Sequence, residues 1–299
     1  MTACDQTDFD YRPAGDAADA VVREGYWATA IGLQRVDGLK PSAYLEQLAE
    51  CHIENTMSLA ETGEALRTYY RQRAAEGKSV DARELEADLV SQRIAEMLNA
   101  GTFAFMPDML AIIHKTLFQD LSHDVYHPGQ FKTENLVKPE TVLNGDSVVY
   151  GDPLFLDAFL VHLFGKEEGH YYGVSFDAAK LEHFSGFISS LWQVHPFWEG
   201  NTRTIAVFAE LYLRNLGFDV SNEPFSKHAR YFRDALVRAN YRNAKAQVMP
   251  DSSFLLKFFE NMLCATQHVL RSRDLLCMPL FDDPMLLRNM PSSGALLEH

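Results

Sequence analysis

The segment AAKLEHFSGFISSLWQVHPFWEGNTRTIAVFAELYLRNL, residues 178–216, decides the fold. Its first part carries apolar side chains at helical spacing and predicts a helix over 178–194. The pair His195-Pro196 ends that helix, because the residue before a proline is pushed away from the helical conformation. A second apolar helix is predicted over 204–216 and stops at Gly217. Two apolar helices joined by a short polar connection predict an α-helical core.

The connection itself, His195-Pro196-Phe197-Trp198-Glu199-Gly200-Asn201-Thr202-Arg203, gathers several reactive groups. His195 is a natural general base for a hydroxyl, since the ordinary pKa of histidine lies near neutrality. Glu199 can hold a magnesium ion that keeps water and phosphate as its other ligands. Gly200 lets the backbone come close to a ligand, and Arg203 can donate paired hydrogen bonds to phosphate oxygens. The free amides of Gly200 to Thr202 would lie where the next helix begins, which favours an anion there.

This connection resembles the signature of the Fic/Doc proteins, His-Pro-Phe-x-(Asp/Glu)-Gly-Asn-x-Arg, at every defined position. A simpler alternative is a histidine that ends one helix and an Asn-Thr cap that starts the next. That alternative explains each residue separately but not their joint order. The resemblance extends over about residues 109–216, where 113–118 is similar to the family's helix before the active site. Residues 129–132 with Asn135 are similar to its approach to the flap.

The resemblance implies an enzyme that transfers AMP from ATP to a Ser, Thr or Tyr hydroxyl of a target protein and releases pyrophosphate. His195 would be the catalytic base, Glu199 would bind Mg²⁺, and Phe197 would be a buried anchor for the loop. The phosphates would be held by the residues that follow, namely Gly200, Asn201, Thr202 and Arg203. ATP and Mg²⁺ are therefore the expected cofactors.

The stretch between His127 and Gly151 differs from the helical parts. It is rich in proline and glycine, and Ser147-Val148-Val149-Tyr150 has strand-like composition just after the turn pair Asn144-Gly145. It predicts a small β-hairpin, although a plain surface loop fits the composition equally well. In the family a β-hairpin flap lies over the site and pairs with the target's backbone, so the resemblance assigns target binding to Ser147, Val148, Val149 and Tyr150.

Two positions depart from the family's pattern. Thr202 stands where many members have glycine, and Ala206 stands where many have a second arginine that helps to hold the terminal phosphate. A small threonine should fit. Ala206 leaves open how ATP is oriented and which group is transferred. The alternatives are a phosphate transfer like that of the Doc branch, and a catalytically weak nucleotide-binding regulator.

Many relatives carry an inhibitory helix with the pattern Ser/Thr-x-x-x-Glu-Gly/Asn. The best match here is Glu54-Asn55, with Glu50 in the place of Ser or Thr. Ser42 with Glu46 is a second match that fails at its last position. We expect Glu54 and Asn55 to be regulatory, with Asn55 helping to end its helix. A solvated acidic face on an ordinary helix explains the same residues.

Helical spacing recurs through most of the chain from about Pro41 onward, so the expected fold is all-α, a Fic-type helical bundle with a small β-hairpin flap over the active site. One further helix is predicted over 254–269. The expected division is an N-terminal helical region over 1–100 with the inhibitory helix, a Fic core domain over 101–220, a C-terminal helical region over 221–296, and a tag remnant at 297–299.

Composition and charge limit the classes of molecule that the chain is expected to bind. The 299 residues hold 41 acidic and 27 basic side chains, and the net charge of −14 has no basic stretch to follow a nucleic-acid backbone. The four cysteines are far apart, and the N-terminal segment 1–20 has no apolar block. We therefore expect a cytoplasmic protein that binds neither nucleic acid nor membrane. Its partner would be a protein with a hydroxyl side chain, and a homodimer and self-modification are further expectations.

Overall fold

The computed structural model describes residues 19–288, so the tag remnant predicted at 297–299 and nearly all of segment 1–20 lie outside the described residues. Within 19–288 the chain is mainly helical, as predicted, and none of its helices is both long and apolar enough to cross a membrane. The α-helices are α1 (Ala20–Leu33), α2 (Ala43–Ile53), α3 (Leu59–Ala75), α4 (Ala82–Ala100), α5 (Asp108–Phe118), α6 (His123–Tyr126), α7 (Leu156–Glu168), α8 (Ala178–Val194), α9 (Asn201–Asn215), α10 (Glu223–Asn240), α11 (Ser253–Leu263) and α12 (Met278–Asp282). The 3-10 helices are η1 (Gln34–Asp37), η2 (Thr141–Leu143), η3 (Pro153–Phe155), η4 (Ser272–Leu275) and η5 (Pro284–Leu286).

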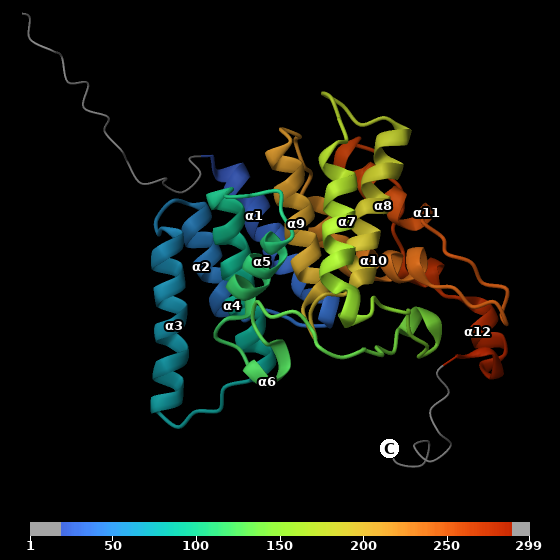
Figure 1. Ribbon diagram of the computed structural model, residues 1–299. Helices are drawn as coiled ribbons and strands as arrows, with labels where there is room; N and C mark the ends of the chain where they lie inside the picture. Colours follow the sequence, from blue (N-terminus) through green and yellow to red (C-terminus); the bar gives the residue numbers. More distant parts are fainter. Residues whose placement is uncertain (1–18, 289–299) are drawn as a thin grey trace, which may run out of the picture.

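Helix α9 lies in the middle of the molecule (Figure 1). Every residue from Asn201 to Leu213 is buried, and the helix packs against α4, α5 and α8. Burial on all sides fixes the helix firmly, because each apolar side chain removed from water adds to its stability. The loop that enters α9 is therefore attached to the most constrained helix of the fold.

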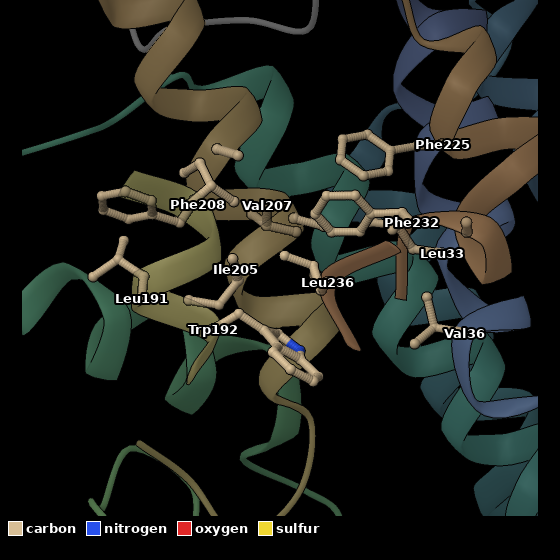
Figure 2. Packing of buried hydrophobic residues seen from close by; sticks show 14 of the residues in the cluster. Leu33, Val36, Leu191, Trp192, Ile205, Val207, Phe208, Phe225, Phe232 and Leu236 are labelled. Carbon is tan, nitrogen blue, oxygen red and sulfur yellow. The ribbon is translucent and has the colours of Figure 1, made fainter. Parts of the chain in front are cut away.

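Helices from both ends of the chain share this core. Helix α1 packs against α4 and α10, and one hydrophobic cluster extends from Trp27 to Leu280. Figure 2 shows the part of it where four segments meet: Leu191 and Trp192 of α8, Ile205, Val207 and Phe208 of α9, Phe225, Phe232 and Leu236 of α10, and Leu33 and Val36 at the end of α1 and in η1. The division into regions 1–100, 101–220 and 221–296 stays a prediction. The shared core means that η1 and α10 are held close to α9.

Local sequence sets the ends of α8. The Asp177 side chain accepts a hydrogen bond from the Lys180 amide at 2.9 Å and caps the first turn. At the other end His195 adopts the left-handed conformation, with φ of 50° and ψ of 63°. The predicted stop at His195-Pro196 is confirmed, and the chain turns sharply there toward α9.

The predicted β-hairpin is not present in this structure. Residues 140–146 form a compact turn around η2, closed by the Glu140 amide, which donates to the Asp146 carbonyl at 2.9 Å. The Lys138 amide then donates to the Ser147 hydroxyl at 3.0 Å instead of to a facing backbone carbonyl. Pro139 has no amide hydrogen to give. A side-chain bond and a proline thus interrupt the ladder that Val148 and Val149 would need.

The helix predicted over 254–269 is shorter than expected. Helix α11 ends at Leu263, and Ala265 adopts the left-handed conformation with φ of 51°. The Asn261 side chain accepts from the His268 amide and donates to the His268 carbonyl, each at 2.8 Å. An amide side chain that binds the backbone in this way competes with a further helical turn.

Candidate active site

The loop between α8 and α9 is held in shape by its own asparagine. Asn201 Oδ1 accepts from the Phe197 amide at 2.9 Å, and Asn201 Nδ2 donates to the Phe197 carbonyl at 2.6 Å. Both groups are buried, where an unpaired amide or carbonyl would be costly. Asn201 therefore closes the loop into one conformation before the helix begins.

His114 of α5 packs against the same loop. Its ring stacks on Phe197 with centroids 3.8 Å apart, and Phe197 is fully buried, as the predicted anchor should be. His114 Nδ1 accepts from the Gly129 amide and Nε2 donates to the Glu199 carbonyl, each at 3.0 Å. Burial lowers the pKa of His114 to about 4, so the ring stays neutral and keeps this tautomer.

Lys132 holds the chain on both sides of His195. Its amide donates to the Pro196 carbonyl at 2.8 Å, and its Nζ donates to the Val194 carbonyl at 3.2 Å. Burial lowers the pKa of this amine to about 8. The sequence resemblance placed Lys132 only in the approach to the flap. Its contacts show that it holds the backbone on both sides of His195, the predicted base.

His195 is buried under Tyr150. The two rings stack with centroids 3.9 Å apart, and His195 Nδ1 lies 3.4 Å from the Trp192 carbonyl. Because a carbonyl only accepts, Nδ1 carries the proton of the neutral ring and Nε2 is left as the basic atom. Burial first, and then the charges of Lys138 and Lys132, hold the pKa of His195 well below its ordinary value. The imidazole is therefore neutral near pH 7.

A small cavity lies between the loop and three other segments. The loop lines it with His195 and the residues from Glu199 to Thr202, and Trp192 of α8 adds a wall. The remaining lining comes from Asp37, Lys138, Glu140 and Arg233. Its volume is about 20 Å³, enough for roughly one water molecule. The predicted base, the predicted metal ligand and the residues whose amides were expected to bind an anion thus line one small cavity.

Glu199 is the acid of the loop. Its side chain is 47% exposed and forms an ion pair with Lys138. Among the described residues no group of three or more His, Cys, Asp or Glu side chains is arranged to hold a metal. A half-exposed carboxylate fits magnesium, which is often bound through one or two carboxylates together with substrate phosphates and water.

Residues 104–213 match the sequence model of the Fic/DOC family. This segment is a Fic/DOC family domain. It contains the whole loop from His195 to Arg203, the 144–150 segment and the helices α5, α8 and most of α9. No match to the chain is found among curated proteins.

Two of the cavity residues lie outside the Fic domain. Asp37 belongs to η1 and Arg233 to α10, and both are far in sequence from the 104–213 segment. Lys138 and Glu140 lie within it. Sequence reasoning found none of the four, because single charged residues at these places carry no pattern. The packing of η1 on α9, and of α10 on η1 and α1, brings Asp37 and Arg233 to the loop.

Arg203 of the Fic domain is turned away from the cavity into an internal network. Its side chain is 1% exposed, with Nε 2.9 Å from Asp37 Oδ2 and Nη2 2.7 Å from Glu86 Oε1. Nη1 donates to Gln34 Oε1 at 3.2 Å, and the guanidinium lies over the Phe118 ring. The phosphate contact expected of Arg203 stays a prediction, while its structural role in joining α9 to η1 and α4 is clear.

We expect Arg203→Gln to lower the free energy of unfolding by about 2 kcal/mol, because Glu86 loses its cation and Asp37 loses one of its two cations while keeping Arg233. Urea denaturation measures this. Arg35→Gln is the matched control, since Arg35 is an exposed arginine whose side chain donates to the Ser226 carbonyl. An equal and small effect of both substitutions would contradict the structural role of Arg203.

The predicted flap residues have different environments in the Fic domain. Ser147, Val148 and Tyr150 are buried, whereas Val149 is 64% exposed. The Val149 carbonyl accepts from Gln193 at 3.3 Å. Tyr150 covers the predicted base, so this segment lies over the site as expected of a flap, although not as a hairpin. Its target-binding role stays a prediction.

Glu54 and Asn55, the predicted regulatory residues, lie at the end of α2. Asn55 has a φ of 60° and its amide donates to the His52 carbonyl, so it ends the helix as predicted. Both side chains are exposed, and neither lines the cavity that holds His195. Regulation by Glu54 stays a prediction. The N-terminal acid that does line the cavity is Asp37.

Proposed function

We propose that this protein is an AMP transferase that moves the AMP part of ATP onto a Ser, Thr or Tyr hydroxyl of a target protein. The observation that carries the proposal is a neutral, buried His195, with Nε2 as its basic atom, that lines one cavity together with the first residues of α9. The Fic/DOC match of residues 104–213 supports a transferase that acts on proteins.

In the proposed reaction the target hydroxyl oxygen forms a bond to the α-phosphorus of ATP. The bond from that phosphorus to the bridging oxygen breaks, pyrophosphate leaves, and the hydroxyl proton passes to His195 Nε2. The amides of Gly200 to Thr202 donate to phosphate oxygens, because the first amides of a helix have no partner within it. Glu199 would hold Mg²⁺, which neutralises phosphate charge when bound.

Nucleotide entry requires the site to open. Tyr150 stacks on His195 and Lys138 is bound to Glu199, and together they leave a volume far below that of a nucleotide. We infer that ATP with Mg²⁺ displaces Lys138 from Glu199 and shifts the 147–150 segment. The released Lys138 would then be free to bind a phosphate oxygen.

Phosphate transfer is the second candidate. Ala206 is fully buried in the core, so α9 offers no cation at the position where many members have their second arginine. Nucleotide orientation decides between the two reactions. Mass spectrometry of a protein extract treated with the chain, ATP and Mg²⁺ tests this. An AMP adduct on a hydroxyl supports the proposal, a phosphate adduct supports the alternative, and no adduct supports a nucleotide-binding regulator.

The low pKa of His195 predicts how kcat/KM depends on pH. Since the pKa of His195 lies well below 6.5, the ring remains neutral as the pH falls through 6.5, and kcat/KM should decline only at lower pH. Lys138→Gln should move this acid limb to higher pH, because removal of a positive charge raises the pKa of His195. A pH profile of kcat/KM measures both effects. A wild-type midpoint above about pH 7 would contradict the assignment of His195 as a buried neutral base.

A cytoplasmic location, a homodimer and self-modification are further parts of this proposal. The described cysteines, Cys51, Cys264 and Cys277, are free thiols, which fits the reducing cytoplasm expected from the sequence. A homodimer and self-modification remain predictions, and gel filtration and the same mass spectrometry test them.

A further inference from the structure

Five charged side chains face the cavity. Lys138 and Arg233 are the cations, and Asp37, Glu140 and Glu199 are the acids. Lys138 is paired with Glu199, the predicted metal ligand. Acids therefore outnumber cations in the cavity. A bound nucleotide would add further negative charge, so at least one cation would have to leave a carboxylate and pair with a phosphate instead.

Arg233 of α10 is placed for such an exchange. Its Nη1 lies 3.1 Å from Asp37 Oδ1 and its Nη2 lies 3.0 Å from Glu140 Oε1. Its buried Nε meets no hydrogen-bond acceptor among the described residues. The guanidinium thus keeps one buried donor without a partner, in a residue that lines the cavity. A phosphate oxygen could satisfy such a donor.

The two acids that hold Arg233 differ in freedom. The Glu140 side chain is 2% exposed and is fixed in the core, whereas the Asp37 side chain is 29% exposed. Asp37 also has a second partner in Arg203, so it remains paired if it leaves Arg233. Asp37 is therefore the partner that an incoming phosphate can replace, while Glu140 keeps the guanidinium in position.

Arg203 is the other arginine near the loop, and it does not line the cavity. Its guanidinium is surrounded by Asp37, Glu86 and Gln34 and is almost wholly buried. A phosphate could reach it only after this network had been broken. Arg233 is the arginine that is already exposed to the space beside the α9 amides.

We propose that Arg233 binds the phosphates of ATP that lie beyond the α-phosphate, and that Asp37 yields its place on Nη1 to a phosphate oxygen. In the proposed reaction the α-phosphorus lies beside His195 and the amides of α9. Arg233 comes from another helix, α10, and is therefore available to bind the phosphates that leave as pyrophosphate. This inference rests on the proposed function, which places a nucleotide in the cavity.

The test is calorimetric titration of the full chain with ATP and with AMP, both in the presence of Mg²⁺. Because Arg233→Gln alone would leave Glu140 buried without its cation, the comparison is between Glu140→Gln and the double variant Glu140→Gln/Arg233→Gln. The double variant should raise the Kd for ATP about tenfold or more over Glu140→Gln, as the loss of a charged hydrogen bond predicts, and should leave the Kd for AMP within about twofold.

Arg230→Gln is the matched control on α10, since Arg230 pairs with Asp234 and does not line the cavity. It should leave both affinities unchanged. Equal ATP affinities of the double variant and Glu140→Gln, or an equal loss for ATP and AMP, would overturn the assignment of Arg233. If the double variant bound ATP more weakly than Glu140→Gln but the wild type transferred no group to any protein, the proposed function would be overturned and the assignment of Arg233 would stand. No binding of ATP by the wild type would overturn both.

Discussion

Replacement of His195 by alanine should lower AMP transfer about a thousandfold or more, because the target hydroxyl would lose its proposed base. Binding of ATP should change by no more than about threefold, since the proposed reaction brings the imidazole to the hydroxyl and not to the phosphates. A labelled-ATP transfer assay and a calorimetric titration measure the two quantities on the same preparation. The contrast between them separates a catalytic role from a general loss of the site.

The control for this substitution is His268→Ala. His268 is 38% exposed, pairs with Glu260 and does not line the cavity, so its loss should leave transfer unchanged. If His195→Ala kept more than about a tenth of the wild-type rate, proton removal by His195 would not be part of the reaction.

The second large effect is expected for Gly200→Ala. Gly200 has a φ of 73°, and a Cβ there would overlap the Phe118 ring. That ring cannot move away freely, because it stacks on Tyr126 at 4.5 Å and lies under the Arg203 guanidinium. Left-handed strain and overpacking together should lower the free energy of unfolding by about 3–5 kcal/mol, which thermal and urea denaturation would detect.

Gly200→Ala should also weaken ATP binding, since the start of α9 must shift to relieve the overlap. Gly186→Ala in α8 is the matched control, because a Cβ there meets nothing within 4 Å. It should stabilise the protein by about 0.5–1 kcal/mol, as alanine favours a helix over glycine. Similar effects of the two substitutions would mean that the conformation of Gly200 has no special role.

The sequence predicted the central part of the fold well. Apolar spacing and the His195-Pro196 break placed α8 and α9 within a few residues of their ends, and Phe197 is the buried anchor that was expected. These features are local, so spacing and proline chemistry decide them. The hairpin was not predictable in the same way, because the Ser147 hydroxyl replaced a backbone partner, which strand-like composition does not reveal.

The cavity depended on tertiary packing. Asp37 and Arg233 are separated by most of the chain, and they meet only because α1 and α10 pack on each other beside α9. Arg203 fits the sequence motif, yet in this structure it is buried and held by Gln34, Asp37, Glu86 and Tyr126. The order of charges along the chain does not determine which guanidinium faces a cavity, because the packing of distant helices decides this.

AMP transfer is tested most directly with ATP labelled on the α-phosphate in one sample and on the γ-phosphate in another. Each is incubated with Mg²⁺, a protein extract and either the wild-type chain or His195→Ala. AMP transfer with His195 as the base predicts protein-bound label from the α-phosphate only, and its loss with His195→Ala. Protein-bound label from the γ-phosphate alone, or equal labelling by the wild type and His195→Ala, would contradict AMP transfer with His195 as the base.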